Sequence, residues 1–172
     1  FYAIDPFHEG GSTQGVDLEQ AGRTIMQTMK RINPEAVWVI QGWQANPRPA
    51  MIEKLEAGDL LALDLFSETR PMWGDPTSSW YRKEGFGKHD WLFCMLLNFG
   101  ERPGMFGKLE TVINSFYDAQ HHASGKTLRG VGATMEGINN NAVMYELLFE
   151  LPWREERFKK EEWIDQYIQA RY

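Results

Sequence analysis

Short apolar runs recur along the chain, and each is followed by a polar segment or by residues with helical spacing. Runs that are apolar throughout, without alternating polar residues, are typical of strands in a parallel sheet covered on both faces. The pattern predicts five such strands, at residues 1–5, 36–43, 60–66, 91–100 and 127–137. We therefore expect an α/β protein with a parallel sheet.

Helical spacing fills most of the intervals between these strands. Residues 17–32 place five apolar residues on one helical face, and these are Leu18, Ala21, Ile25, Met29 and Ile32. Further helices are predicted from Pro49 to Gly58, over 105–123, from about 140 to before Pro152, and over 160–172. Residues 67–90, rich in Gly, Pro, Trp and Ser, are expected to form a long loop with a short helix at most.

Alternating strands and helices predict right-handed βαβ units, which leaves two architectures open. One is an open doubly wound sheet, and the other is a (β/α)8 TIM barrel, which needs eight strands when complete. Five strands would then be the C-terminal part of a barrel, a partial TIM barrel belonging to a larger catalytic domain.

Polar residues at the ends of the predicted strands favour the barrel. They are Asp5, His8, Glu9, Gln41, Trp43, Asp64, Glu68, Asn98 and Glu136. The C-terminal ends of parallel strands lie at one face, where such folds place their sites. Loops begin where strands end, and loops are polar, so the position of any one of these residues needs no functional explanation. Loop polarity explains less well why two glutamates and several aromatic residues occur together at these ends.

Glu9 and Glu136 are the candidate catalytic pair. Each lies just past a strand and precedes a glycine, in HEGG and MEGI. Glycoside hydrolysis needs two converging carboxylates, one to protonate the leaving oxygen and one to attack or to activate water. Either glutamate alone also fits a solvated or helix-capping carboxylate, and Glu136 can serve the N-terminus of the following helix.

Composition narrows the class of protein. The 172 residues suit one domain, and 42% hydrophobic and 24% charged residues indicate a folded chain. The net charge of -6 argues against nucleic acid or an anionic membrane as partner, and no apolar run is long enough for a membrane span. The single cysteine, Cys94, excludes a disulfide framework and is expected to be a buried thiol. Seven Trp, six Tyr and ten Phe, several near polar or glycine-rich stretches, suit a sugar site, although Trp is also common in protein cores.

Other motifs do not carry chemistry. SGKT at 124–127 has Gln120 where a P-loop needs its first glycine, and GVGATMEG lacks dinucleotide-binding spacing. His121 and His122 are adjacent on a helix and cannot easily face one metal ion, and His89 is expected to be a solvated loop residue. We expect neither a metal nor an organic cofactor.

Five blocks of the sequence resemble the α-N-acetylglucosaminidase family, glycoside hydrolase family 89. In order, they are FHEGG, AVWVIQGW, LLALDLFSET, FCMLLNFG and GVGATMEGINNNAVMYELLFELPW. The resemblance covers residues 1–153. It implies that residues 1–153 are the C-terminal part of a barrel catalytic domain and that 154–172 begin a C-terminal helical region.

The resemblance also implies a function. Such a protein is a retaining exo-glycosidase that removes terminal α-linked N-acetylglucosamine from glycans by double displacement, outside the cytoplasm in a secreted, periplasmic or lysosomal location. Glu9 matches the acid/base, Glu136 matches the nucleophile, and Trp43 matches an aromatic residue lining the sugar pocket.

Four further residues are candidates for binding sugar hydroxyls. They are His8, Asn98, Asp5 and Asp64. His8 stands where some relatives have asparagine, and it is equally suited to a structural role. Asp64 is equally consistent with a carboxylate inside the barrel whose hydrogen bonds are supplied by neighbouring residues.

Two alternatives remain at this point. The chain can be an inactive or glycan-binding piece of such an enzyme, lacking upstream barrel strands and able to self-associate through its open sheet edges. It can also be an unrelated α/β hydrolytic or binding domain, in which Glu9 and Glu136 lie far apart.

Overall fold

The computed structural model describes residues 1–97, 107–137 and 140–172. Within them, five strands form one sheet in the order β1-β2-β3-β4-β5, with every neighbouring pair parallel. The strands are β1 (Tyr2–Ala3), β2 (Trp38–Gly42), β3 (Leu60–Asp64), β4 (Asp90–Met95) and β5 (Leu128–Ala133). The prediction of a parallel sheet of five strands is confirmed.

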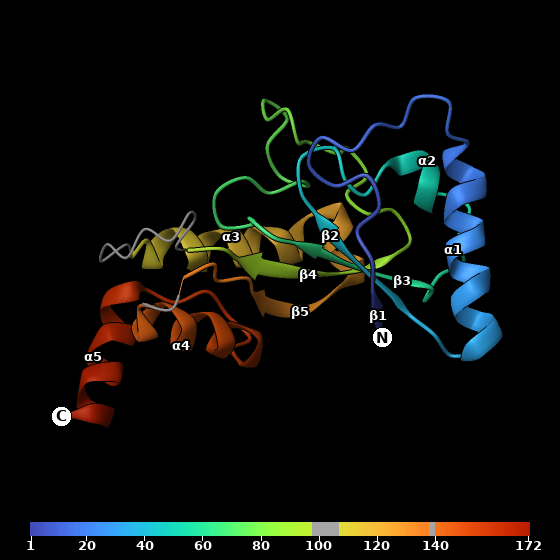
Figure 1. Ribbon diagram of the computed structural model, residues 1–172. Helices are drawn as coiled ribbons and strands as arrows, with labels where there is room; N and C mark the ends of the chain where they lie inside the picture. The colour runs from blue at the N-terminus through green and yellow to red at the C-terminus, as the bar shows by residue number, and fades with distance from the viewer. Residues whose placement is uncertain (98–106, 138–139) are drawn as a thin grey trace.

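Helices occupy the predicted intervals. They are α1 (Leu18–Ile32), α2 (Pro49–Ile52), α3 (Leu109–His121), α4 (Ala142–Glu150) and α5 (Lys160–Arg171), with 3-10 turns η2 (Ala123–Thr127) and η3 (Leu151–Trp153). In Figure 1, α1 and α2 lie beside one end of the sheet, and α3, α4 and α5 lie toward the other. The predicted loop before β4 contains only turns and bends.

The strands bury alternate residues against the helices. Trp38, Ile40, Leu60 and Ala62 are almost fully buried, and the intervening residues of β2 and β3 are half-buried on the other face. The sequence predicted cover on both faces, and within the described residues the second face is only partly covered. The pocket described below opens on the C-terminal ends of these strands.

Three local predictions were wrong. Ile32 was placed on the inward face of α1 but is 78% exposed, while Gly22 and Met26 are buried instead. His89 was expected in solvent but is 2% exposed, with Nε2 2.9 Å from the carbonyl oxygen of Ile52. The helix begun by Pro49 ends at Ile52, well before Gly58.

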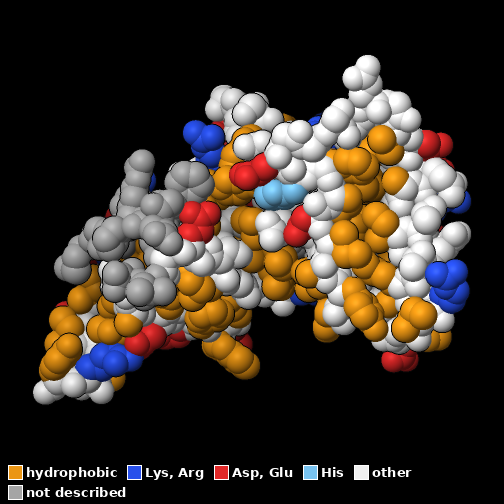
Figure 2. Space-filling view, viewed as in Figure 1, with side chains coloured by type: hydrophobic (Ala, Val, Ile, Leu, Met, Phe, Trp, Pro, Cys, Tyr) orange, Lys and Arg blue, Asp and Glu red, His pale blue; other side chains and the backbone are white. Residues whose placement is uncertain are grey.

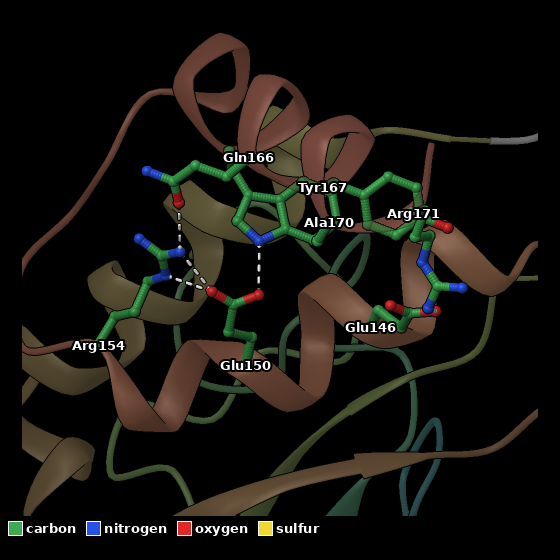
Figure 3. Close-up of a pocket in the computed structure, with 8 residues that line it drawn as sticks. Glu146, Glu150, Arg154, Gln166, Tyr167, Ala170 and Arg171 are labelled. Atoms are coloured by element: carbon green, nitrogen blue, oxygen red, sulfur yellow. Dashed lines mark hydrogen bonds and ion pairs between the residues drawn. The ribbon is translucent and has the colours of Figure 1, made fainter.

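A second pocket, of about 400 Å³, lies between α4 and α5 (Figure 3). The Trp163 indole donates to Glu150 Oε2 at 2.7 Å, and Arg154 Nε donates to Glu150 Oε1 at 2.6 Å. Arg154 Nη2 also donates to Gln166 at 2.9 Å. These bonds join α4 to α5, so we interpret this pocket as a packing junction between two helices.

Candidate active site

A pocket of about 470 Å³ opens where the strands end. It is lined by His8, Glu9, Gln41, Trp43, Leu63, Leu65, Leu96, Thr134, Met135 and Glu136. Each of the five strands contributes its own end or the residues just after it. In the space-filling view of Figure 2, a histidine side chain lies close to acidic side chains near the middle of the face in view. The two glutamates, far apart in the sequence, therefore share one pocket.

Glu9 lies on a strained turn after β1. Phe7 and Glu9 have φ angles of 60° and 31°, a region that residues other than glycine rarely adopt, and Gly10 has a φ of 76°. A Cβ at Gly11 would lie 2.6 Å from the Cα of Phe7, so the second glycine is required by close contact. Backbone strain of this kind costs about 1–3 kcal/mol per residue and is concentrated at functional sites.

Trp43 holds the carboxylate of Glu9. Its indole Nε1 donates a hydrogen bond to Glu9 Oε1 at 2.9 Å, joining the turn after β1 to the end of β2. The indole is 9% exposed and packs edge-on against Trp80, with ring centroids 4.7 Å apart. The Glu9 side chain is thus exposed, and its hydrogen-bond partner Trp43 is buried among packed aromatic rings.

Thr134 fixes the strand end that carries Glu136. Its amide donates to Met95 O at 3.0 Å, and its hydroxyl lies 3.1 Å from Leu65 O and 3.3 Å from Met95 O. The residue therefore ties the end of β5 to the ends of β3 and β4. Glu136 follows two residues later and is exposed at the pocket.

The other predicted binding residues are placed differently. His8 lines the pocket, and its Nε2 is buried without a hydrogen-bond partner in the described part of the chain. Asp5 Oδ1 accepts from the Gln41 amide at 2.7 Å and links β1 to β2 outside the pocket lining. Asn98 lies outside the described residues.

Asp64 is an internal carboxylate. It is 1% exposed, does not line the pocket, and its Oδ2 accepts from the Met72 amide at 3.1 Å. Desolvation by burial raises the pKa of Asp64 to about 7. The burial agrees with the internal alternative, but Asp64 Oδ1 has no hydrogen-bond partner in the described residues, so its neighbours satisfy only one oxygen. A role in sugar binding stays a prediction.

Glu68 supports the pocket wall. Its Oε1 accepts from the amides of Leu96 and Leu97, both at 3.0 Å, and Leu96 lines the pocket. Desolvation by burial raises the pKa of Glu68 to about 7. The side chain is thus a clamp on the backbone that leaves β4.

The described residues offer neither a cluster of metal ligands nor a reactive cysteine. They contain no group of three or more His, Cys, Asp or Glu side chains that could hold a metal ion. Cys94 is buried as predicted, it forms no disulfide, and burial raises the pKa of its thiol well above the usual range. None of the helices in the described ranges is both long and apolar enough to cross a bilayer.

A parallel β/α sheet whose strand ends gather two glutamates and a tryptophan around one pocket has the active-site arrangement of a TIM-barrel glycoside hydrolase. The family model described as the alpha-N-acetylglucosaminidase (NAGLU) tim-barrel domain matches residues 1–155, and the chain belongs to this family. The sheet is therefore part of a TIM-barrel domain and not an open doubly wound sheet.

Known relatives agree with this assignment. Human alpha-N-acetylglucosaminidase is 32% identical over 183 aligned residues, which cover 99% of this chain and 24% of the human protein. A family 89 glycoside hydrolase from Clostridium perfringens, with two glutamate-to-glutamine substitutions and its substrate GlcNAc-alpha-1,4-galactose bound, is 34% identical with a TM-score of 0.83. The same type of enzyme in complex with PUGNAc is 35% identical with a TM-score of 0.82. The chain is covered completely in both cases and spans 18% of those chains.

Proposed function

We propose that this chain carries the catalytic pair of a retaining exo-glycosidase that hydrolyses terminal α-linked N-acetylglucosamine. The observation that carries the proposal is that Glu9 and Glu136 line one pocket at the ends of parallel strands. The Clostridium relative supports the substrate class, because it is seen with GlcNAc-alpha-1,4-galactose bound after two of its glutamates were replaced by glutamine.

The proposed reaction has two displacements. In the first, the Glu136 carboxylate attacks the anomeric carbon while Glu9 gives its proton to the glycosidic oxygen, so the bond to the leaving group breaks and an ester forms. In the second, Glu9 takes a proton from water, the water oxygen attacks the same carbon, and the ester bond breaks. Each step inverts the anomeric carbon, so the released sugar is first the α-anomer.

The division of the chain and the location of the protein are also proposals. Residues 1–153 form the barrel part and 154–172 begin a helical region, in agreement with the end of η3 at Trp153 and the start of α5 at Lys160. The partner is a glycan with a terminal N-acetylglucosamine, and the compartment is extracytoplasmic by resemblance to the family.

The test is release of a chromogenic phenol from an α-N-acetylglucosaminide. Glu136→Ala should abolish release, and Glu9→Ala should lower kcat/KM by about 10²–10⁴, the usual contribution of general acid–base catalysis. Azide needs no base to attack, so in Glu9→Ala it should restore turnover and give the α-glycosyl azide after two inversions. In Glu136→Ala any azide product should be the β-anomer, formed by a single direct displacement.

Glu156→Ala is the matched control, since Glu156 is exposed and does not line the pocket. Full activity in Glu136→Ala, or an equal loss in Glu156→Ala, would contradict the proposal.

A further inference from the structure

We infer that Trp43 is a positioning residue for Glu9: its indole N–H holds one carboxylate oxygen and thereby assigns the transferred proton to the other. This inference rests on the proposed function, because it gives Glu9 the acid/base role. It adds a function to Trp43 that is separate from contact with the sugar.

The bond itself selects the oxygen. Trp43 Nε1 lies 2.9 Å from Glu9 Oε1. An indole nitrogen can only donate a hydrogen bond, so Oε1 must be the acceptor whether Glu9 is ionised or protonated. When Glu9 acts as the acid, its proton therefore lies on Oε2.

Trp43 is immobile enough to impose this geometry. Trp43 as a whole is 9% exposed, and its ring lies edge-on to Trp80 at 4.7 Å and 6.1 Å from Phe66 between centroids. Its backbone closes a turn with Asn46, in which the amide of each donates to the carbonyl of the other at 3.2 and 2.9 Å.

The segment around that turn is also anchored. The Arg82 guanidinium donates to Ala45 O at 3.1 Å and to Pro47 O. A Cβ at Gly42 would lie 2.9 Å from Leu63 O, so the glycine of QGW lets β2 lie against β3 at this point.

Glu9 depends on such a partner. It is exposed on a turn with positive φ, and a glutamate side chain has several rotamers to lose on being fixed. A hydrogen bond from a rigid donor restricts these rotamers before the sugar binds. Less conformational entropy is then lost on reaching the transition state, so the reaction is faster. The same packing leaves little of the indole face open for stacking on a sugar.

The inference predicts a dependence on the leaving group. Trp43→Phe keeps an aromatic ring and removes the donor. A phenyl leaving group needs protonation by Glu9, so kcat/KM for the phenyl substrate should fall by about tenfold or more, as for loss of a hydrogen bond to a charged group. A 2,4-dinitrophenyl leaving group departs without being protonated, so kcat/KM for that substrate should change little in Trp43→Phe.

The experiment compares these two substrates in the natural polypeptide that contains this chain. Trp73→Phe is the matched control, because Trp73 is 4% exposed and its Nε1 has no hydrogen-bond partner in the described residues. We expect the two substrates to respond differently in Trp43→Phe and alike in Trp73→Phe. An equal loss on both substrates in Trp43→Phe, or a rise in KM alone, would assign Trp43 to packing or stacking and overturn the inference.

A second measurement tests the contact without turnover. In protein labelled with ¹⁵N-tryptophan, the Trp43 indole N–H resonance should move as Glu9 titrates and should stop moving in Glu9→Gln. A resonance that does not respond to Glu9 overturns the inference even in an active protein. Failure of the wild type to hydrolyse either substrate counts instead against the proposed function.

Discussion

Two buried carboxylates hold the backbone behind the pocket. Asp64 accepts from an amide of the following loop, and Glu68 accepts from two amides just after β4. Burial raises the pKa of both to about 7. A carboxyl that binds its proton more tightly when folded stabilises the fold below its unfolded pKa, and this stabilisation is lost as the pH rises through the folded pKa.

We therefore expect Asp64→Asn to change the pH dependence of stability. The wild type should lose stability between about pH 4 and pH 7, by up to about 4 kcal/mol from Asp64 at about 1.4 kcal/mol per unit of pKa. The asparagine oxygen can still accept from Met72. Relative to the wild type, the variant should thus be more stable at pH 8 than at pH 4.5.

The measurement is the melting temperature across this pH range. Asp165→Asn, at an exposed aspartate of α5, is the control and should follow the wild type at every pH. Parallel curves for Asp64→Asn and the wild type would show that Asp64 is ionised throughout in the folded protein.

At the scale of the element, the strands were predictable because their signal is local. β2 and β3 lie within two residues of the predicted runs, since β-branched and apolar residues cluster there. Burial on a helix depends on which neighbour it packs against. Gly22 is buried because α1 approaches α2 so closely that a Cβ there would lie 1.9 Å from Met51 O, and Ile32 extends past this contact.

The candidate site was predictable to a similar degree. Glu9, Trp43 and Glu136 were found because each follows a strand, and strand ends share a face of a parallel sheet. Thr134 was missed because its role consists of bonds to carbonyl groups of residues distant in the sequence. The sequence predicted a strand over 127–137, which placed Thr134 inside it, whereas β5 ends at Ala133.

The docking of α5 on α4 gives a prediction at this scale. Trp163 is 2% exposed, bonds to Glu150, and stacks on Tyr167 with centroids 5.2 Å apart. Trp163→Ala should cost about 3–5 kcal/mol, as for other buried aromatic residues. Denaturant unfolding measures this loss, and hydrogen exchange of the α5 amides reports it if the helix opens alone.

Trp153 provides the control for Trp163. It is 85% exposed, so Trp153→Ala should change stability by less than about 0.5 kcal/mol, as is usual for exposed positions. Similar costs for the two substitutions would mean that α5 is not held by the indole of Trp163.

At the scale of the whole molecule, the two glutamates come from opposite edges of the sheet. Glu9 follows β1 and Glu136 follows β5, and these strands are the first and last in the strand order. In a flat sheet the edge strands would be about 19 Å apart, at about 4.8 Å between neighbours. Both residues nevertheless line one pocket, so the sheet must curve as a barrel wall does. The proposed retaining mechanism requires carboxyl groups about 5–5.5 Å apart.

In the proposed reaction Glu136 forms a bond to the anomeric carbon while Glu9 moves the proton. A 5-fluoro-N-acetylglucosaminyl fluoride tests it most directly, because the ring fluorine slows both steps and the fluoride leaving group speeds only the first. Peptide mapping by mass spectrometry should find the sugar esterified to Glu136 and no label on Glu9. A label on any other residue, or hydrolysis that releases the β-anomer with no labelled peptide, would contradict the account.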